Sequence, residues 1–179
     1  MEWFWYFIFY SLAGCGLEKV YALVTRARHR VRKCFLLLPL CPVYGLAMTA
    51  VLALAGEEES FWRLALYGGI LCTAVEYAVH FLYEKCLGVL FWDYSGTHLD
   101  LNRRICFPFG VAWGLLSALA VRYVQPWAAL AAGAMPPWAA LAALLLLTAD
   151  SFFTVRLLRR SGNIDLLGFK NLWRELHQT

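Results

Sequence analysis

Several long stretches of this sequence contain almost no charged side chain. A helix of about 20 apolar residues is long enough to cross the hydrocarbon core of a bilayer, which is ~30 Å thick. The chain of 179 residues is 61% hydrophobic and 16% charged, whereas a soluble domain carries about 25% charged residues. The sequence therefore predicts an all-α, polytopic integral membrane helical bundle that forms a single membrane domain.

Five segments are expected to cross the bilayer, namely residues 3–24, 34–55, 61–83, 105–124 and 138–158. The second segment differs from the others because Pro39 and Pro42 lie near its start. A proline removes a backbone donor and clashes with the preceding helical turn. Either the helix begins near Pro42, where a proline is tolerated, or the span is broken there. Residues 159–179 form a polar tail that is expected to be cytoplasmic.

The basic residues predict how the chain is oriented. Most of the 16 Lys and Arg side chains fall on one side of a five-span arrangement, including the loop at residues 26–33 that starts with Arg26 and ends with Lys33. Cytoplasmic loops carry an excess of Lys and Arg, so we expect the N-terminus outside and the C-terminus inside. The same loop is a candidate site for anionic lipid. The net charge of +4 thus indicates a lipid bilayer as partner and not nucleic acid.

Three ionisable residues interrupt the third apolar segment. Glu76, His80 and Glu84 are four residues apart, which places them on one face of a helix. The same face continues to Gly69 and Thr73, as expected where helices pack together. Ionisable side chains inside a membrane are costly, so their presence is a functional-site hypothesis by default.

A metal site or a bound cofactor is not expected. Only one of the three ionisable residues on that face is a histidine, and Glu76 and Glu84 are too far apart along a straight helix to share one ion. The six cysteines form no C-x-x-C pair, and we interpret them as buried small hydrophobic residues.

Polar side chains elsewhere are candidates for the same functional cluster: Glu18, Tyr44, Trp92, Asp93, Tyr94, Asn102, Arg104 and Asp150. One hypothesis is a polar cavity near the cytoplasmic face, lined by the third helix and capped by residues 93–104. Glu76 would be the deepest carboxylate in it, and Glu84, Asp93 and Arg104 would form a charged cluster with it. The other hypothesis is that these side chains form buried ion pairs that fix helix packing.

Several short motifs carry a family resemblance: Pro42-Val43-Tyr44-Gly45, Glu76-Tyr77, Trp92-Asp93-Tyr94-Ser95, Asn102-Arg103-Arg104-Ile105-Cys106 and Trp113-Gly114. Together they resemble the small membrane proteins described as ABC-transporter type IV permeases, with the vertebrate transmembrane-229 proteins as relatives. The resemblance covers most of residues 10–155. One departure is Arg103, where the family usually has a glycine. A glycine permits a positive φ that an arginine adopts only at a cost.

The resemblance implies a permease-like component of a transport system in the cell membrane, inner or plasma. The sequence has no G-x-x-x-x-G-K-[ST] motif, so ATP hydrolysis would need a separate ATPase subunit. Two alternatives stay open. One is a membrane-embedded enzyme acting on a lipid, with Glu76, Glu84 or Asp93 as general acid or base and Arg103 and Arg104 holding a phosphate. The other is a packing or scaffold protein. A transport role is favoured over an enzymatic one.

The orientation is the first prediction that can be tested. Reporter domains fused after Lys33 and after Thr179 should both lie in the cytoplasm, and a reporter fused near Gly56 should lie outside, because basic loops stay on the cytoplasmic side. A reporter after Thr179 that lies outside would contradict the five-span arrangement.

Overall fold

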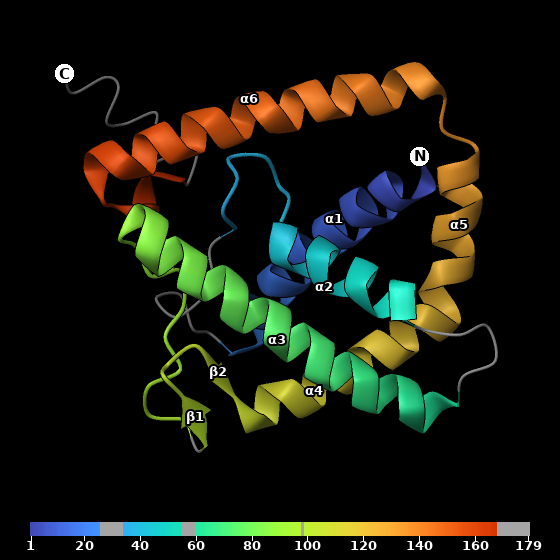
Figure 1. The fold of residues 1–179 in the computed structure, drawn as a ribbon, viewed down its shortest axis with the longest axis horizontal. Helices are drawn as coiled ribbons and strands as arrows, with labels where there is room; N and C mark the ends of the chain where they lie inside the picture. The colour runs from blue at the N-terminus through green and yellow to red at the C-terminus, as the bar shows by residue number, and fades with distance from the viewer. Residues whose placement is uncertain (26–33, 55–59, 98, 168–179) are drawn as a thin grey trace.

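The computed structural model describes residues 1–25, 34–54, 60–97 and 99–167. Its helices are α1 (Glu2–Thr25), α2 (Pro42–Leu54), α3 (Phe61–Leu87), α4 (Phe107–Leu119), α5 (Gln125–Gly133) and α6 (Pro137–Ser161), with a π-helical turn η1 (Ala120–Val124) and a 3₁₀ turn η2 (Ile164–Leu167). Two short strands, β1 (Asp100–Leu101) and β2 (Ile105–Cys106), form a hairpin between α3 and α4. Figure 1 shows the arrangement.

Four helical segments in the described chain are long and apolar enough to cross a membrane: Glu2–Thr25, Phe61–Leu87, Phe107–Gly133 and Pro137–Ser161. This confirms the prediction of an all-α membrane bundle. The second predicted segment, residues 34–55, supplies only α2, whose 13 residues are too few to cross a bilayer alone. The orientation of the termini stays a prediction, and the loop at residues 26–33 lies outside the described residues.

The segment that leads into α2 has no regular secondary structure, and α2 begins at Pro42. The backbone amides of Leu37 and Leu38 donate to the two carboxylate oxygens of Asp150 on α6, at 3.2 and 3.0 Å. Irregular backbone at membrane depth is tolerated only where protein or a cavity satisfies it. Asp150 therefore has a structural role here, because it supplies the acceptors that this segment lacks.

Small residues allow α3 and α4 to pack closely against each other. The two helices run antiparallel side by side (Figure 1). A Cβ added to Gly114 on α4 would overlap the carbonyl oxygen of Ala65 and crowd Gly69, both on α3. The inward side of α3 is buried, with Glu76 only 2% exposed, whereas Tyr67 on the opposite side is 42% exposed. The packing face predicted for this helix is thus confirmed.

The fourth long helix is bent. It runs through α4 into the π-helical turn η1 and continues as α5, and Pro126 lies in the first turn of α5. A π-turn and a proline both disrupt the regular hydrogen-bond ladder of a helix. In Figure 1, α4 follows α3 and α5 turns away from it. The Tyr10 hydroxyl of α1 donates to Gln125 Oε1 at 2.9 Å, so α1 is tied to the start of α5.

The strands β1 and β2 are connected by Asn102, Arg103 and Arg104, and the φ angles of Asn102 and Arg103 are +53° and +62°. Arg104 N donates to the carbonyl of Leu101 at 3.1 Å and closes the turn. Two positive φ angles define a type I′ turn, for which Asn-Gly is strongly preferred. Arg103 thus occupies the position at which the resembling family has glycine, and its backbone adopts the glycine-like conformation.

Replacing Arg103 with glycine should therefore stabilise the protein by about 0.5–1 kcal/mol, because glycine removes the cost of the left-handed conformation. The exposed ion pair of Arg103 with Asp93, at 3.9 Å, contributes little and its loss should not cancel the gain. The measurement is the thermal unfolding midpoint in detergent. Arg103→Gln is the matched control, since it removes the same charge without relieving the backbone. Equal stability of the two variants would show that the turn conformation has no measurable cost.

Candidate functional site

The ionisable face of α3 lies at the centre of the candidate site. Ser60 caps the N-terminus of α3 by accepting a hydrogen bond from Arg63 N, and Gly88 ends the helix in the left-handed conformation. Between these ends, Glu76 and His80 are 2% and 3% exposed. Burial of two ionisable groups requires hydrogen-bonding partners from other elements, and the loop after α3 supplies most of them.

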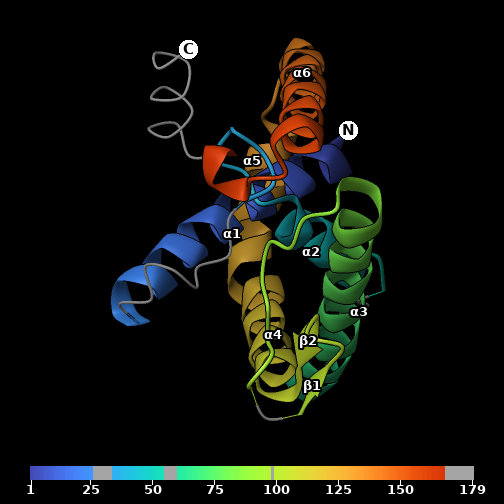
Figure 2. The same ribbon diagram turned by 90° about the vertical axis from the view of Figure 1, so that its left-hand side faces the viewer.

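After Gly88 the chain turns back and runs along the α3–α4 pair to the β1–β2 hairpin (Figure 2). His80 Nε2 donates to the carbonyl oxygen of Trp92 at 3.0 Å, which requires a proton on that nitrogen. Trp92 Nε1 donates to the carbonyl oxygen of Arg104 at 2.9 Å. The Tyr94 hydroxyl donates to Glu76 Oε1 at 2.8 Å. Each of these bonds satisfies a buried polar atom and fixes the loop against α3.

Arg104 joins the loop to the end of α3. Its guanidinium donates to Glu84 Oε2 at 2.6 Å and to the Tyr77 hydroxyl at 3.0 Å. It also lies over the rings of Tyr77 and Phe81, 5.1 and 5.4 Å from their centroids. Asn102 donates to the same Tyr77 hydroxyl at 3.1 Å. The hydrogen bond to Glu84 raises the pKa of Arg104 above its ordinary value, so this cation stays charged at every accessible pH.

Asp93 lies at the surface of the loop. Its carboxylate accepts from the backbone amide of Ser95 at 2.7 Å, which holds the pKa of Asp93 below its usual value. Its nearest cation is Arg103 at 3.9 Å. The predicted cluster of Glu76, Glu84, Asp93 and Arg104 is therefore not a single group. Arg104 pairs with Glu84, Asp93 faces Arg103, and Glu76 receives hydrogen bonds from aromatic side chains.

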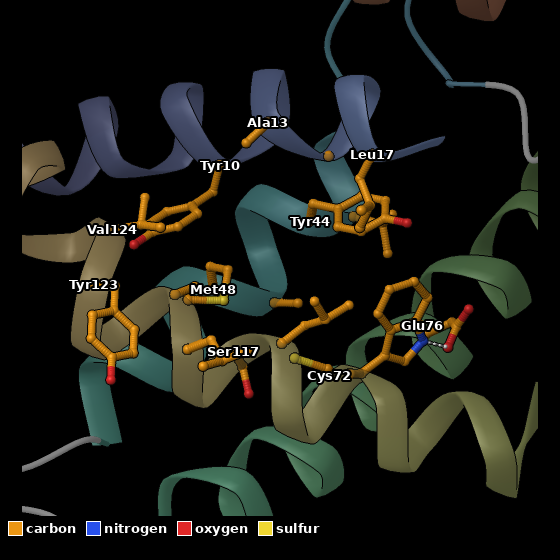
Figure 3. A pocket seen from close by; sticks show the side chains of 17 residues that line it. Tyr10, Ala13, Leu17, Tyr44, Met48, Cys72, Glu76, Ser117, Tyr123 and Val124 are labelled. Carbon is orange, nitrogen blue, oxygen red and sulfur yellow. Dashed lines mark hydrogen bonds between the residues drawn. The ribbon is translucent and has the colours of Figure 1, made fainter. Parts of the chain in front are cut away.

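Glu76 also forms part of the wall of a cavity. Trp113 Nε1 on α4 donates to Glu76 Oε2 at 3.0 Å, so both carboxylate oxygens accept from an aromatic side chain. Figure 3 shows Glu76 at one end of the cavity, with Tyr10, Tyr123 and Val124 toward the other end. These two hydrogen bonds hold the Glu76 carboxylate in one orientation, and it forms a polar part of the cavity wall.

The cavity has a volume of about 520 Å³ and is lined by α1, α2, α3, α4 and η1. Its wall consists mainly of apolar and aromatic side chains, among them Leu17, Val43, Met48, Cys72 and Leu116. This lining is more apolar than the sequence led us to expect, because the charged partners of α3 lie in the loop on the other side of Glu76. The polar part of the wall is limited to a few groups.

Tyr44 provides a second polar group in the wall. Its hydroxyl donates to Glu18 Oε1 on α1 at 2.6 Å, and its ring packs edge-on against Trp113 with the centroids 5.5 Å apart. A Cβ on Gly14 would overlap the Tyr44 ring, so this glycine lets the ring lie against α1. Glu18 and Glu76 are two of the three buried carboxylates in the described residues, and they are linked through Tyr44 and Trp113.

The structure brings most of the predicted residues together in this region: Glu18, Tyr44, Glu76, His80, Glu84, Trp92, Tyr94, Asn102 and Arg104. Asp150 and Asp93 are the exceptions, since Asp150 binds the lead-in to α2 and Asp93 lies at the surface of the loop, where it faces Arg103. Sequence reasoning missed Trp113 and Tyr10 as wall residues. A signal existed for Trp113, because a buried indole N–H usually finds an acceptor. In the part of the chain that is described, no group of three metal-ligating side chains is present.

A comparison with known protein families gives one result. The model of the family described as "Putative ABC-transporter type IV" matches residues 5–155. The match covers most of the chain, so the protein belongs to this family. No curated protein and no solved structure matches the chain.

The ion pair of Arg104 and Glu84 provides a test of the loop's attachment to α3. Arg104→Ala should lower the unfolding midpoint by several degrees, because Glu84 loses its cation and two aromatic rings lose a packing partner. Arg103→Ala should have a smaller effect, since the Arg103 side chain is 58% exposed and that of Arg104 only 13%. Glu84→Gln added to Arg104→Ala should restore part of the loss. Strictly additive effects in this double-mutant cycle would contradict the pairing.

Proposed function

We propose that this protein is a permease-like membrane component of a transport system and that the cavity bounded by α1, α2, α3, α4 and η1 is its ligand site. The family description, with its reference to ABC transporters, supports the transport part of the proposal. Because the sequence has no P-loop motif, energy from ATP would come through a separate ATPase subunit. The proposed location is the cell membrane.

The observation that carries the proposal is the Glu76 carboxylate in the wall of an otherwise mostly apolar cavity. Burying a carboxylate has a cost of several kcal/mol even when it is well bonded, and an apolar residue of similar size often packs with greater stability. A ligand pocket has this composition, with apolar walls and a few placed polar groups that fix orientation. Glu76 would be the group that orients the ligand.

The backbone around the cavity also supports a ligand path. The lead-in to α2 is irregular, and η1 is a π-helical turn whose residues Ala120, Tyr123 and Val124 line the cavity. Membrane transporters commonly form substrate sites beside broken helices, and π-turns frequently occur at functional sites. The enzymatic alternative is less well supported, because Arg103 and Arg104 face Asp93 and Glu84 and do not form an open phosphate site.

Glu76→Gln tests the proposal. It should leave the thermal unfolding midpoint within a few degrees of the wild type, because the amide oxygen can still accept from the Trp113 indole while the amide nitrogen donates to the Tyr94 hydroxyl, whose oxygen can also accept. It should abolish retention of the ligand, measured by mass spectrometry of the small molecules that remain with the full chain through purification in detergent. Cells that depend on this protein for uptake of the ligand should take up less of it when they carry Glu76→Gln.

A second variant, Ala47→Phe, should have the same effect on retention by filling the cavity, while Ala142→Leu on the exposed side of α6 is the matched control and should retain the ligand. If the wild type, Glu76→Gln and Ala47→Phe all retained the same small molecules through purification, the proposal would be overturned.

A further inference from the structure

We propose that the C-terminal end of α6 carries a binding site for the phosphate group of an anionic phospholipid, formed by Arg156, Arg159 and Arg160 together with Phe152. This site is separate from the cavity and does not depend on the function proposed for it. The proposal rests on the position of these side chains on the helix, on their lack of anionic partners, and on the apolar surface beside them.

The four side chains lie on one face of α6. Phe152, Arg156 and Arg160 follow one another at intervals of four residues, and Arg159 lies three residues after Arg156, so these side chains are neighbours on the helix surface. Together with Val155 they line a hollow of about 340 Å³. Thr154 and Leu158 are 0% exposed and occupy the opposite side of the helix, where α6 packs on the rest of the bundle. The arginine face therefore points away from the protein, toward the position that lipid occupies around a membrane helix.

The charges on this face are not neutralised by the described part of the protein. None of the three arginines forms an ion pair or a side-chain hydrogen bond there. The loop after α3 differs, because Arg104 lies 2.6 Å from Glu84 and Arg103 lies 3.9 Å from Asp93. The end of α6 is thus a concentrated positive charge that an anion outside the described chain would neutralise.

The neighbouring residues favour a lipid over a free anion. α6 is apolar for most of its length, and Phe152, one turn before Arg156, is 61% exposed. A phosphate held by the arginines would lie at the depth of the lipid head groups, with its acyl chains against Phe152. Guanidinium groups bind phosphate oxygens in a bidentate geometry. Positive-inside topology accounts for basic residues on one side of the membrane, but it does not require that they share one helix face beside an exposed aromatic ring.

The test uses the full chain in neutral detergent micelles and a fluorescent phosphatidylglycerol, whose binding is followed by polarisation. Each basic side chain near an anionic surface contributes about a factor of five in affinity. Replacing all three arginines with glutamine should therefore weaken binding about 100-fold. The matched control removes three positive charges elsewhere (Arg63→Gln, Lys85→Gln and Arg122→Gln) and should change the affinity by much less. Phosphatidylcholine should not compete.

Two further measurements separate a lipid from a free anion. Phe152→Ala should weaken binding of phosphatidylglycerol several-fold, because the acyl chains lose an apolar contact, and millimolar inorganic phosphate should compete poorly. Equal losses in the α6 triple variant and in the charge-matched control would overturn the proposal, since net charge alone would then explain binding. Strong competition by inorganic phosphate combined with no effect of Phe152→Ala would also overturn it, because the site would then bind the free anion.

Discussion

Polar groups inside a hydrocarbon layer must find their partners within the protein, and this constraint determines how the structure is held together. The two buried carboxylates on α3 and α6 meet it in different ways. Asp150 accepts from the backbone amides of Leu37 and Leu38, so it completes an irregular segment. Glu76 accepts from the Tyr94 hydroxyl and the Trp113 indole, so it completes a cavity wall. The Asp150 carboxylate is needed for the fold, because it satisfies the amides of the lead-in to α2. The Glu76 carboxylate lies where packing alone would favour an apolar residue.

Aromatic side chains make the burial of Glu76 compatible with an apolar cavity. Tyrosine and tryptophan combine a large apolar surface with a single hydrogen-bond donor. Tyr44 and Trp113 use the donor for Glu18 and Glu76, respectively, while their rings pack edge-on against each other beside the cavity. The carboxylates are therefore satisfied without a change in the apolar character of the wall. A ligand that reaches Glu76 would meet an acceptor whose orientation is already fixed, which reduces the cost of ordering it on binding.

The sequence predicted the features that depend on local pattern, and it could not predict those that depend on contacts between distant residues. The long apolar segments and the buried face of α3 followed from composition and helical period. The prolines indicated that the second segment was unusual, and the structure gives α2 as a short helix that begins at Pro42. The partners of Asp150 lie more than 100 residues away in the chain, and nothing local identifies them. Arg104 pairs with Glu84 and Arg103 faces Asp93. These separate pairings likewise depend on a loop that folds back along α3, which no local pattern in the sequence indicates.

The walls of the cavity differ in how regular their backbone is, and this bears on how the proposed ligand site would open. α3 is a regular helix fixed by caps at both ends and by the hydrogen bond from Tyr94 to Glu76. α2 follows an irregular lead-in, and η1 interrupts the helix between α4 and α5. Irregular segments can rearrange at a lower free-energy cost than the interior of a long helix. A cavity that admits a ligand would therefore change shape at α2 and η1, while α3 keeps Glu76 in place. Tyr10 connects the start of α5 to α1, so such a change at η1 would be transmitted to the first helix.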